Sequence, residues 1–476
     1  MSLGIAMPAE ARVAQVTRTM WLILIAVVMA DALDLMDATL TMIAAPTIAA
    51  NLGGGELLIK WLGSAYALAL GSLLVVGGRL GDRFGQRRTF LIGIAGFTLA
   101  SAACGIAPNS AVLIAGRLLQ GGFGALLIPQ GVAVLTSTFP REMLGKAFSA
   151  FGPTLAVASV AGPLLGAFIV TANIGGLSWR PMFLINVVIG SIGFVLAWNV
   201  MPRTPGDRSV VLDGVGSGLL SAAMLMLIYG LIEGSTSGWA PIDLVAILCG
   251  LVCFAAFGLR QARAANPLIK PSLLANRGFT AGIIVALGFF SIVSGLGYVL
   301  SLFLQQGMGL TAVEAALSGI APMAIGIMVA SFGAAPLIEG LGRRLVLAGL
   351  VLTLVGVAGL WVVIAVQGSA VGPWSLTLPV FVIGLGMGCG FGSLFAIALG
   401  DIDHAEAGSA SGSLSAVQQL AAAIGSAAIT SIWFRSMTAD VTGAMITCLA
   451  VVAIVLVACM ALVGLLPRQA AAEDGH

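Results

Sequence analysis

The chain has 476 residues, of which 59% are hydrophobic and only 8% are charged, and its formal net charge is +2. Soluble domains carry about 25% charged residues, so this composition excludes a soluble enzyme and predicts an integral membrane protein built from helices. Because membrane topology accounts for the basic residues, the net charge gives no reason to expect a nucleic-acid partner.

Apolar runs long enough to cross about 30 Å of hydrocarbon recur along the whole chain. Cytoplasmic loops of membrane proteins carry the excess of lysine and arginine. With both termini inside, only Lys60, Arg180 and Arg435 of the 21 basic residues lie on outer loops, and Arg117 lies within a span. We therefore predict a multi-pass protein with both termini in the cytoplasm. The fourteen predicted spans begin near residues 20, 58, 89, 110, 145, 179, 212, 241, 278, 313, 345, 375, 407 and 441.

Three aspartates, Asp31, Asp34 and Asp37, lie near the middle of the first apolar run, from Trp21 to about Ala45. A carboxylate at mid-bilayer costs about 2.5 to 3.5 kcal/mol, so it is retained where it meets water, a counter-ion or a proton. At about 100° per residue the three side chains share one face of the helix. We expect this face to line a cavity in which all three aspartates bind substrate and Asp34 and Asp37 also carry protons.

The turn after the second span combines glycine, acid and arginine at Gly78, Asp82, Arg83, Gly85 and Arg87. Glycine permits a tight turn and close approach of helices, the acid can accept backbone N–H groups or pair with arginine, and the arginines hold the loop in the cytoplasm. This composition predicts a gating loop that latches neighbouring helices. The alternative is an ordinary cytoplasmic turn with no moving role.

A second loop later in the chain repeats this spacing. If the two loops are equivalent, spans one to six repeat as spans nine to fourteen, and spans seven and eight are an insertion. We therefore predict a 6+2+6 arrangement, with an N-terminal six-helix bundle at 1–203, two inserted helices at 204–270 and a C-terminal six-helix bundle at 271–476. The matched pairs are Asp82 with Glu339, Gly85 with Gly342, and Arg87 with Arg344.

Arg117 is placed at a depth where it could meet the first span. At about 1.5 Å per residue, Asp34 lies roughly 21 Å and Arg117 roughly 18 Å from the cytoplasmic edge of the bilayer. A nearby guanidinium favours the charged carboxylate, whereas dry surroundings and neighbouring acids favour the protonated form. Alternation between these settings would couple a proton to a conformational change. The structural alternative is a buried ion pair that holds spans one and four together.

The fifth span carries Gly162, Pro163 and Gly166. A membrane helix tolerates Gly-Pro where neighbouring groups satisfy the freed carbonyl, and small residues let two helices approach closely. We therefore expect a kink and a close helix contact here.

These motifs together resemble the major facilitator superfamily, and specifically its fourteen-span branch of drug:proton antiporters. The resemblance runs along the whole chain. Its implied site residues are the gating loop from Gly78 to Arg87, a coupling arginine at Arg117, and an antiporter motif at Gly162, Pro163 and Gly166 that prevents leakage. The residues that carry the resemblance are Gly78, Leu80, Asp82, Arg83, Gly85 and Arg87 in the loop; Leu113, Arg117, Gln120 and Gly121 in span four; Gly162, Pro163 and Gly166 in span five; and Asp37, Thr39, Ala44 and Pro46 in span one.

The resemblance implies the major facilitator fold and a proton-coupled antiporter in the bacterial cytoplasmic membrane, working as a monomer. It would export lipophilic, cationic drugs by alternating access, driven by the proton gradient without a cofactor. The six cysteines lie in apolar segments without paired spacing, so no disulfide and no metal site is expected. The acidic inside loop from Asp401 to Glu406 has no explanation in this scheme.

Two other functions remain open at this level. The first is a proton-coupled transporter of one specific metabolite or natural product, because the fold alone sets neither ligand nor direction. The more distant one is a membrane-embedded enzyme that uses paired aspartates as acid and base. The nearness of Asp34 to Asp37 is the only feature that favours the enzyme.

Overall fold

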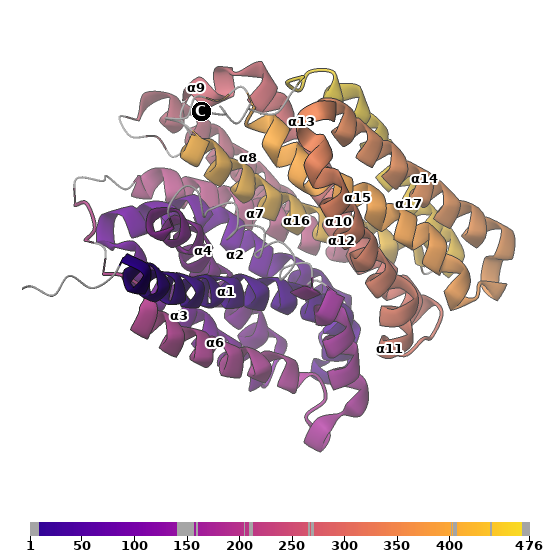
Figure 1. The fold of residues 1–476 in the computed structure, drawn as a ribbon. Coiled ribbons are helices and arrows are strands. Elements are labelled where there is room, and N and C mark those ends of the chain that lie inside the picture. The colour runs from indigo at the N-terminus through magenta and orange to yellow at the C-terminus, as the bar shows by residue number, and fades with distance from the viewer. Residues whose placement is uncertain are drawn as a thin grey trace, which may run out of the picture.

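A computed structural model describes residues 9–139, 157–158, 160–203, 205–208, 213–264, 267, 271–400, 402, 407–437 and 440–468. In these ranges the chain forms helices and no strand, which confirms the all-α class (Figure 1). The start of the predicted fifth span and, apart from Ile402, the acidic loop from Asp401 to Glu406 lie outside the described residues.

Among the described residues, 13 helices are long and apolar enough to cross a membrane, and a shorter apolar helix, Val160–Ala172, falls at the fifth predicted span. In the first part of the chain the long helices are α1 (Ala9–Leu52), α2 (Gly55–Phe84), α3 (Gln86–Gly105), α4 (Ser110–Thr138), α6 (Arg180–Val200), α7 (Gly214–Ser237) and α8 (Pro241–Arg263). In the second part they are α10 (Arg277–Leu302), α12 (Ala321–Ala334), α14 (Arg343–Gln367), α15 (Thr377–Ala398), α16 (Ala407–Met437) and α17 (Val441–Val463). Shorter elements are η1 (Ile174–Gly176), α9 (Pro271–Ala275), η2 (Phe303–Gly307), α11 (Ala312–Ala315), η3 (Ala316–Ile320), η4 (Ala335–Leu337), α13 (Ile338–Leu341), η5 (Gly368–Ala370) and η6 (Pro373–Leu376).

The helices gather into two groups with a pair between them. Figure 1 shows helices α1, α2, α3, α4 and α6 on one side and helices α12, α14, α15 and α17 on the other, with α16 beside α7 near the middle. Helices α7 and α8 pack on each other, and α7 contacts both α2 and α16. These contacts agree with the 6+2+6 order, and the predicted domain boundaries at 203–204 and 270–271 fall in connections between helices.

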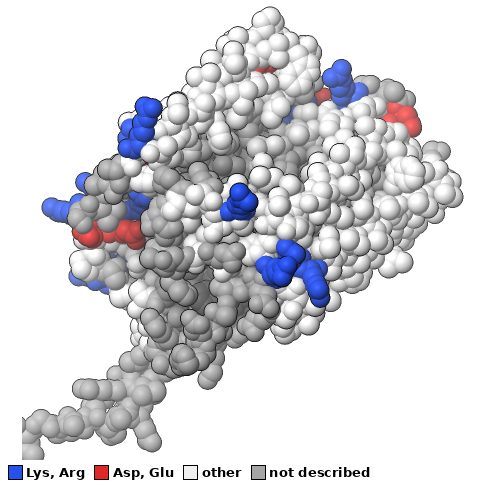
Figure 2. Space-filling model, turned by 90° about the horizontal axis from the view of Figure 1, so that it is seen from above, with Lys and Arg blue, Asp and Glu red and all other residues white. Residues whose placement is uncertain are grey.

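Most of the visible surface is uncharged. Figure 2 shows one face of the molecule that is mostly uncharged, with lysines, arginines and acids at its edges and a few basic side chains near its middle. Many large apolar side chains of the long helices are exposed, for example Leu99, Val195 and Ile454. This is the pattern expected where lipid rather than water surrounds the helices.

The two loops that the sequence paired share a backbone feature. Gly85 separates α2 from α3 with φ +95°, and Gly342 separates α13 from α14 with φ +51°. Residues with a Cβ rarely adopt such angles, so each glycine lets one helix end and the next begin at once. The spacing that suggested a repeat therefore corresponds to equivalent helix junctions.

An arginine beside each of these glycines caps the end of a distant helix. The Nη2 of Arg87 donates to the carbonyl of Trp198 (2.6 Å) near the end of α6. The Nη1 of Arg343 donates to the carbonyls of Gly464 (2.7 Å) and Leu466 (3.2 Å) just beyond α17. A cation at a helix C-terminus meets unpaired carbonyls and the negative end of the helix dipole, so both contacts stabilise the junctions. The second arginine is Arg343, one residue before the Arg344 that the spacing paired with Arg87.

Candidate functional site

The three aspartates of α1 differ in their surroundings. Asp37 is completely buried, with 0% of its surface exposed, whereas Asp31 and Asp34 are half-buried. In this conformation Asp37 therefore lines no open cavity, and the expectation that all three carboxylates face one is wrong for Asp37. Its position deeper along α1 places it among other helices of the first bundle.

Asp37 is the centre of a polar network built by four helices. Its carboxylate pairs with Arg117 of α4, and it accepts hydrogen bonds from Asn186 Nδ2 of α6 (2.5 Å) and Gln120 Nε2 of α4 (3.4 Å). Gln120 also accepts from Arg117 Nη1 (3.0 Å) and donates to Ser101 Oγ of α3 (2.8 Å). All five residues are at most 1% exposed. A charge so deep in the protein is stable only when it is paired and hydrogen-bonded, as it is here.

Aromatic rings complete the surroundings of Arg117. Its guanidinium carbon lies 4.6 Å from the ring centre of Tyr66 on α2 and 5.9 Å from that of Phe183 on α6. Away from water, the negative faces of such rings add to the stabilisation that the carboxylate provides. The depth estimate placed Arg117 level with Asp34, but the structure pairs it with Asp37, which lies one helical turn farther along the same face of α1.

Asp34 lies beside this network without a hydrogen-bond partner for its Oδ1, which is buried. The hydroxyl of Tyr66 is also buried and unpaired. Both oxygens border the space left by Gly124, because a Cβ there would lie 3.0 Å from Tyr66 Oη and 3.8 Å from Asp34 Oδ1. Unpaired buried polar atoms are costly, so two of them around one notch indicate a place for a water molecule, a proton or a polar ligand group.

The predicted motif of the fifth span packs on the aspartate helix. A Cβ at Gly162 would lie 2.0 Å from Thr39 Oγ1, and one at Gly166 would lie 2.7 Å from Ile43. Because neither glycine has a Cβ, this span can approach α1 closely at Thr39 and Ile43, which follow Asp37 along that helix. Pro163 between them is buried.

The predicted gating loop lies at the α2–α3 junction and not among the contacts of Asp37. Asp82 is exposed there, Gly78, Arg83 and Arg87 are half-buried, and Gly85 is buried. The backbone N–H of Asp207 donates to the carbonyl of Asp82 (2.8 Å), so the segment that leads from α6 to α7 rests on the loop.

Sequence reasoning missed Asn186 and Tyr66, and it noted Gln120 only as part of a motif. Asn186 was detectable, because it is an amide in the middle of an otherwise apolar span. Tyr66 carried no such signal, since an aromatic residue in a membrane helix is ordinary. Its role depends on which helix faces α4, and periodicity does not fix that.

Comparison with known proteins adds the following matches. Residues 27–426 match the Major Facilitator Superfamily. Over 427 residues the chain is 40% identical to a probable actinorhodin transporter of Streptomyces coelicolor, covering 89% of this chain and 74% of the relative. It is 34% identical over 334 residues to a tetracenomycin C resistance and export protein of Streptomyces glaucescens, covering 67% and 61%. It is 31% identical over 420 residues to a puromycin resistance protein of Streptomyces alboniger, covering 87% and 81%.

Solved structures resemble the whole fold at low sequence identity. A crystal structure of the peptide transporter POT in complex with sulfate has a TM-score of 0.68 at 16% identity, covering 92% of this chain and 94% of that chain. A D-xylose–proton symporter has a TM-score of 0.63 at 16% identity, covering 92% and 97%. At these identities the likeness concerns the fold and not the ligand.

Proposed function

The chain belongs to the Major Facilitator Superfamily, and we propose that it is a proton-coupled antiporter of the fourteen-span drug:proton branch. The family membership and the transporter relatives identify a transporter rather than an enzyme. As its function we propose export of lipophilic, cationic drugs or toxic small molecules across the bacterial cytoplasmic membrane, with both termini in the cytoplasm and a single chain as the working unit.

The observation that carries this proposal is the contrast between Asp37 and Asp34. Asp37 is fully paired with Arg117 and neutral donors, whereas Asp34, one turn away, has an unpaired oxygen beside the notch at Gly124. A proton or a cationic cargo on Asp34 would satisfy that oxygen, and each would remove the negative charge that Asp34 adds beside the Asp37–Arg117 pair. Competition of the two ligands for one carboxylate is sufficient for exchange if each also favours the conformational change.

Contacts between the two halves support a particular state in this cycle. Ser64 Oγ lies 3.1 Å from Ser426 Oγ, Gln305 Nε2 donates to the carbonyl of Ile43 (3.0 Å), and Ser301 Oγ donates to that of Met42 (3.3 Å). With the termini inside, these contacts lie toward the external half of the bilayer. We infer that the structure is closed on the outside, the state in which cytoplasmic cargo would bind.

A second candidate is a dedicated exporter of one natural product. Two of the relatives that cover most of this chain are named for single compounds, actinorhodin and puromycin. A transporter of this kind would use the same carboxylates for proton coupling but would recognise one cargo closely. Export assays across a panel of cationic and neutral compounds would separate the two, because a dedicated exporter would move one compound and its near analogues only.

Proton release on addition of drug to the purified protein tests the mechanism. Asp34→Asn is expected to abolish the release, and Asp37→Asn to reduce it strongly because Arg117 loses its counter-ion. Asp31→Asn is the matched control on the same face of α1, and it should change drug affinity while release persists at saturating drug. Unchanged release from both Asp34→Asn and Asp37→Asn would exclude the proposed coupling.

A further inference from the structure

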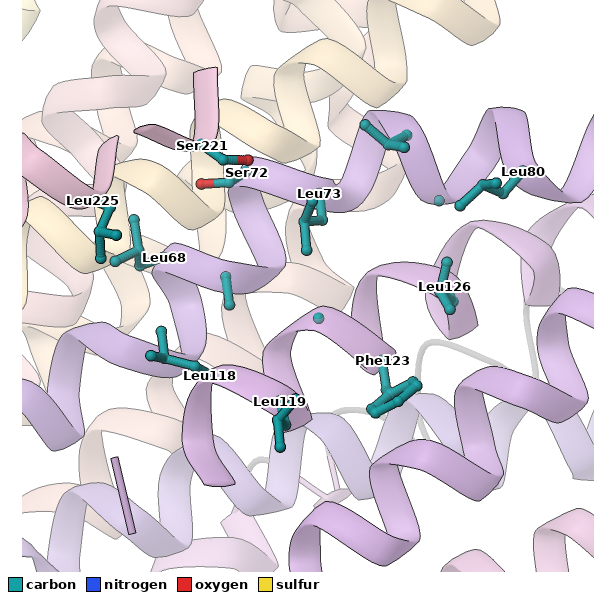
Figure 3. A pocket seen from close by; sticks show the side chains of 14 residues that line it. Leu68, Ser72, Leu73, Leu80, Leu118, Leu119, Phe123, Leu126, Ser221 and Leu225 are labelled. Atoms are coloured by element: carbon teal, nitrogen blue, oxygen red, sulfur yellow. The ribbon is translucent and has the colours of Figure 1, made fainter. Parts of the chain in front are cut away.

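A cavity of about 450 Å³ lies between α2, α4 and α7 (Figure 3). None of its lining residues belongs to the polar network of Asp37. Its walls are leucine, valine, alanine, glycine and phenylalanine side chains from α2 and α4, closed on one side by Ser221 and Leu225 of α7. The volume lies in the range of drug-sized ligand sites. No ionisable side chain lines it.

Two hydroxyl groups in this pocket have no hydrogen-bond partner. The Oγ atoms of Ser72 on α2 and Ser221 on α7 are both buried and unpaired. Only 4% of Ser72 is exposed. Figure 3 shows the two serines near each other in one part of the pocket, with Leu80 and Leu126 at its other end. Serines in membrane helices usually bond to a carbonyl of their own helix, so this pair is available to a ligand.

The pocket opens toward the bilayer. At its rim Leu119 of α4 is 54% exposed and Leu225 of α7 is 45% exposed, and lipid chains surround such leucines in a membrane. On α4, Leu119 and Leu126 line the pocket, whereas Arg117 faces Asp37 from nearly the opposite side of the same helix. A molecule in the pocket is therefore separated from the polar network by the width of one helix.

We propose that this pocket binds neutral, lipophilic molecules of drug size that carry a carbonyl or hydroxyl group, and that it takes them directly from the bilayer. The ligand's polar group exchanges hydrogen bonds with Ser72 and Ser221, and its apolar body fills the remaining space. The absence of a lining charge selects against ions, which cannot be desolvated there without a partner. A lipid acyl chain is the less suitable occupant because it would leave both hydroxyls unsatisfied.

Binding at this pocket is argued from its lining residues alone. Only the statement that the bound molecule is then transported rests on the proposed export function. It also gives α7 a role, since without that helix the pocket would lose one wall and one of its two hydroxyls. Binding at the pocket and transport can be measured separately.

The test uses the full-length protein in lipid nanodiscs and the photoreactive probe 4-hydroxybenzophenone, which carries both a carbonyl and a hydroxyl group. After illumination, mass spectrometry of peptides maps the labelled residues. Labelling is expected on the pocket walls of α2, α4 and α7. The double substitution Ser72→Ala with Ser221→Ala should lower it about three- to tenfold, as expected for lost hydrogen bonds.

A filling substitution provides the second variant. A Cβ at Gly122 would meet only Leu73, at 3.6 Å, so Gly122→Leu should place its side chain in the pocket and abolish labelling without unfolding the protein. Gly258→Leu on α8 is the matched control, because Gly258 is exposed and a Cβ there would meet nothing within 4 Å. Labelling of Gly258→Leu should equal that of the unsubstituted protein.

Two results would overturn the proposal. One is labelling that persists in Gly122→Leu or that is not reduced in the double serine variant. The other is competition by diphenylmethane, which lacks both polar groups, as strong as competition by ordinary 4-hydroxybenzophenone against a deuterated form of the probe. Labelling at the pocket together with no drug-dependent proton release would support the site and contradict the export function, so the two failures are distinguishable.

Discussion

Asp37 stabilises the packing of several helices, a role that its position in the first span does not indicate. Its carboxylate holds side chains of α4 and α6 together, and through Gln120 it reaches Ser101 of α3. A buried pair of this kind adds little net stability compared with an apolar packing, but the loss of one partner leaves a charge that nothing balances. The pair of Asp37 and Arg117 therefore joins spans one and four, which is the structural alternative considered for Arg117 from the sequence, and proton coupling by Asp37 stays a proposal.

Substitution of Asp37 by asparagine should destabilise the protein strongly. Arg117 would remain buried with only neutral partners, at a cost of about 3 to 5 kcal/mol. Thermal unfolding in detergent should show a clearly lower midpoint for Asp37→Asn than for Asp31→Asn, the control on the same helix. Equal midpoints for these two variants would mean that Asp37 is not needed as a charge in this state.

Two substitutions of Tyr66 can distinguish the contribution of its aromatic ring from that of its hydroxyl group. Tyr66→Phe keeps the ring over Arg117 and removes an unpaired buried oxygen, so stability should be unchanged or slightly higher. Tyr66→Leu removes the ring and should cost about 1 to 2 kcal/mol. If the notch at Gly124 holds a water molecule that serves Asp34, drug-dependent proton release should slow in Tyr66→Phe despite its intact fold. Release at the original rate would exclude a role for the hydroxyl.

At the scale of the helix, Arg87 and Arg343 each cap the end of a distant helix, so substitutions can test whether the two loops are equivalent. Arg343→Ala should lower the free energy of unfolding by about 1 to 2 kcal/mol, because it removes a charged donor from two carbonyls just beyond α17. Arg344→Ala is the control and should be nearly neutral, since Arg344 is exposed. The reverse order of effects would show that the sequence alignment, and not the observed contact, identifies the capping residue.

The α7–α8 pair depends on an acid at its end. Asp213 accepts hydrogen bonds from Arg260 Nε (2.8 Å), the Gly216 N–H (2.9 Å) and Gln261 Nε2 (3.2 Å). Burial raises the pKa of Asp213, but the hydrogen bonds from Arg260, Gly216 and Gln261 outweigh it and hold the pKa below its ordinary value. The charged form therefore stabilises the fold.

This stabilisation should be complete above the unfolded-state pKa of about 3.9 and should disappear as the pH falls below it toward the folded-state pKa. Unfolding midpoints measured from pH 6 to pH 3 should show unsubstituted protein more stable than Asp213→Asn at pH 6. The difference should shrink below about pH 4. A difference that does not change with pH would mean that the carboxylate's charge is not what joins α7 to α8.

The helices could be predicted from the sequence more accurately than the contacts between their side chains. Span positions, the helix break at Gly85 and the glycine packing of the fifth span follow from hydropathy and residue size, which act locally. The depth estimate placed Arg117 level with Asp34, whereas the structure pairs it with Asp37, because depth along an axis leaves the rotation of each helix undetermined. The contacts of Asn186 and Tyr66 depend on how six helices pack around one another. The hydrophobic periodicity of one sequence does not determine that packing.

For the whole molecule, the contact between Ser64 and Ser426 is a place where a disulfide could join the two halves. These residues belong to different halves, and their hydroxyl oxygens are 3.1 Å apart. The double variant Ser64→Cys with Ser426→Cys should form a disulfide on oxidation and hold the halves together on that side. Drug export in vesicles should stop on oxidation and return on reduction, whereas each single variant should be insensitive. Export that continues in the oxidised double variant would contradict a required separation of the two halves.

The network around Asp37 also constrains the order in which the protein is made. Arg117 follows Asp37 by 80 residues and Asn186 follows it by 149 residues. While the ribosome is still producing those later helices, the first span carries three acids, and the partners of Asp37 do not yet exist. Nascent chains arrested before α4 should therefore cross-link through α1 to the insertion machinery, and chains arrested after α6 should not. The helix that enters the membrane first would thus be among the last to be released into lipid.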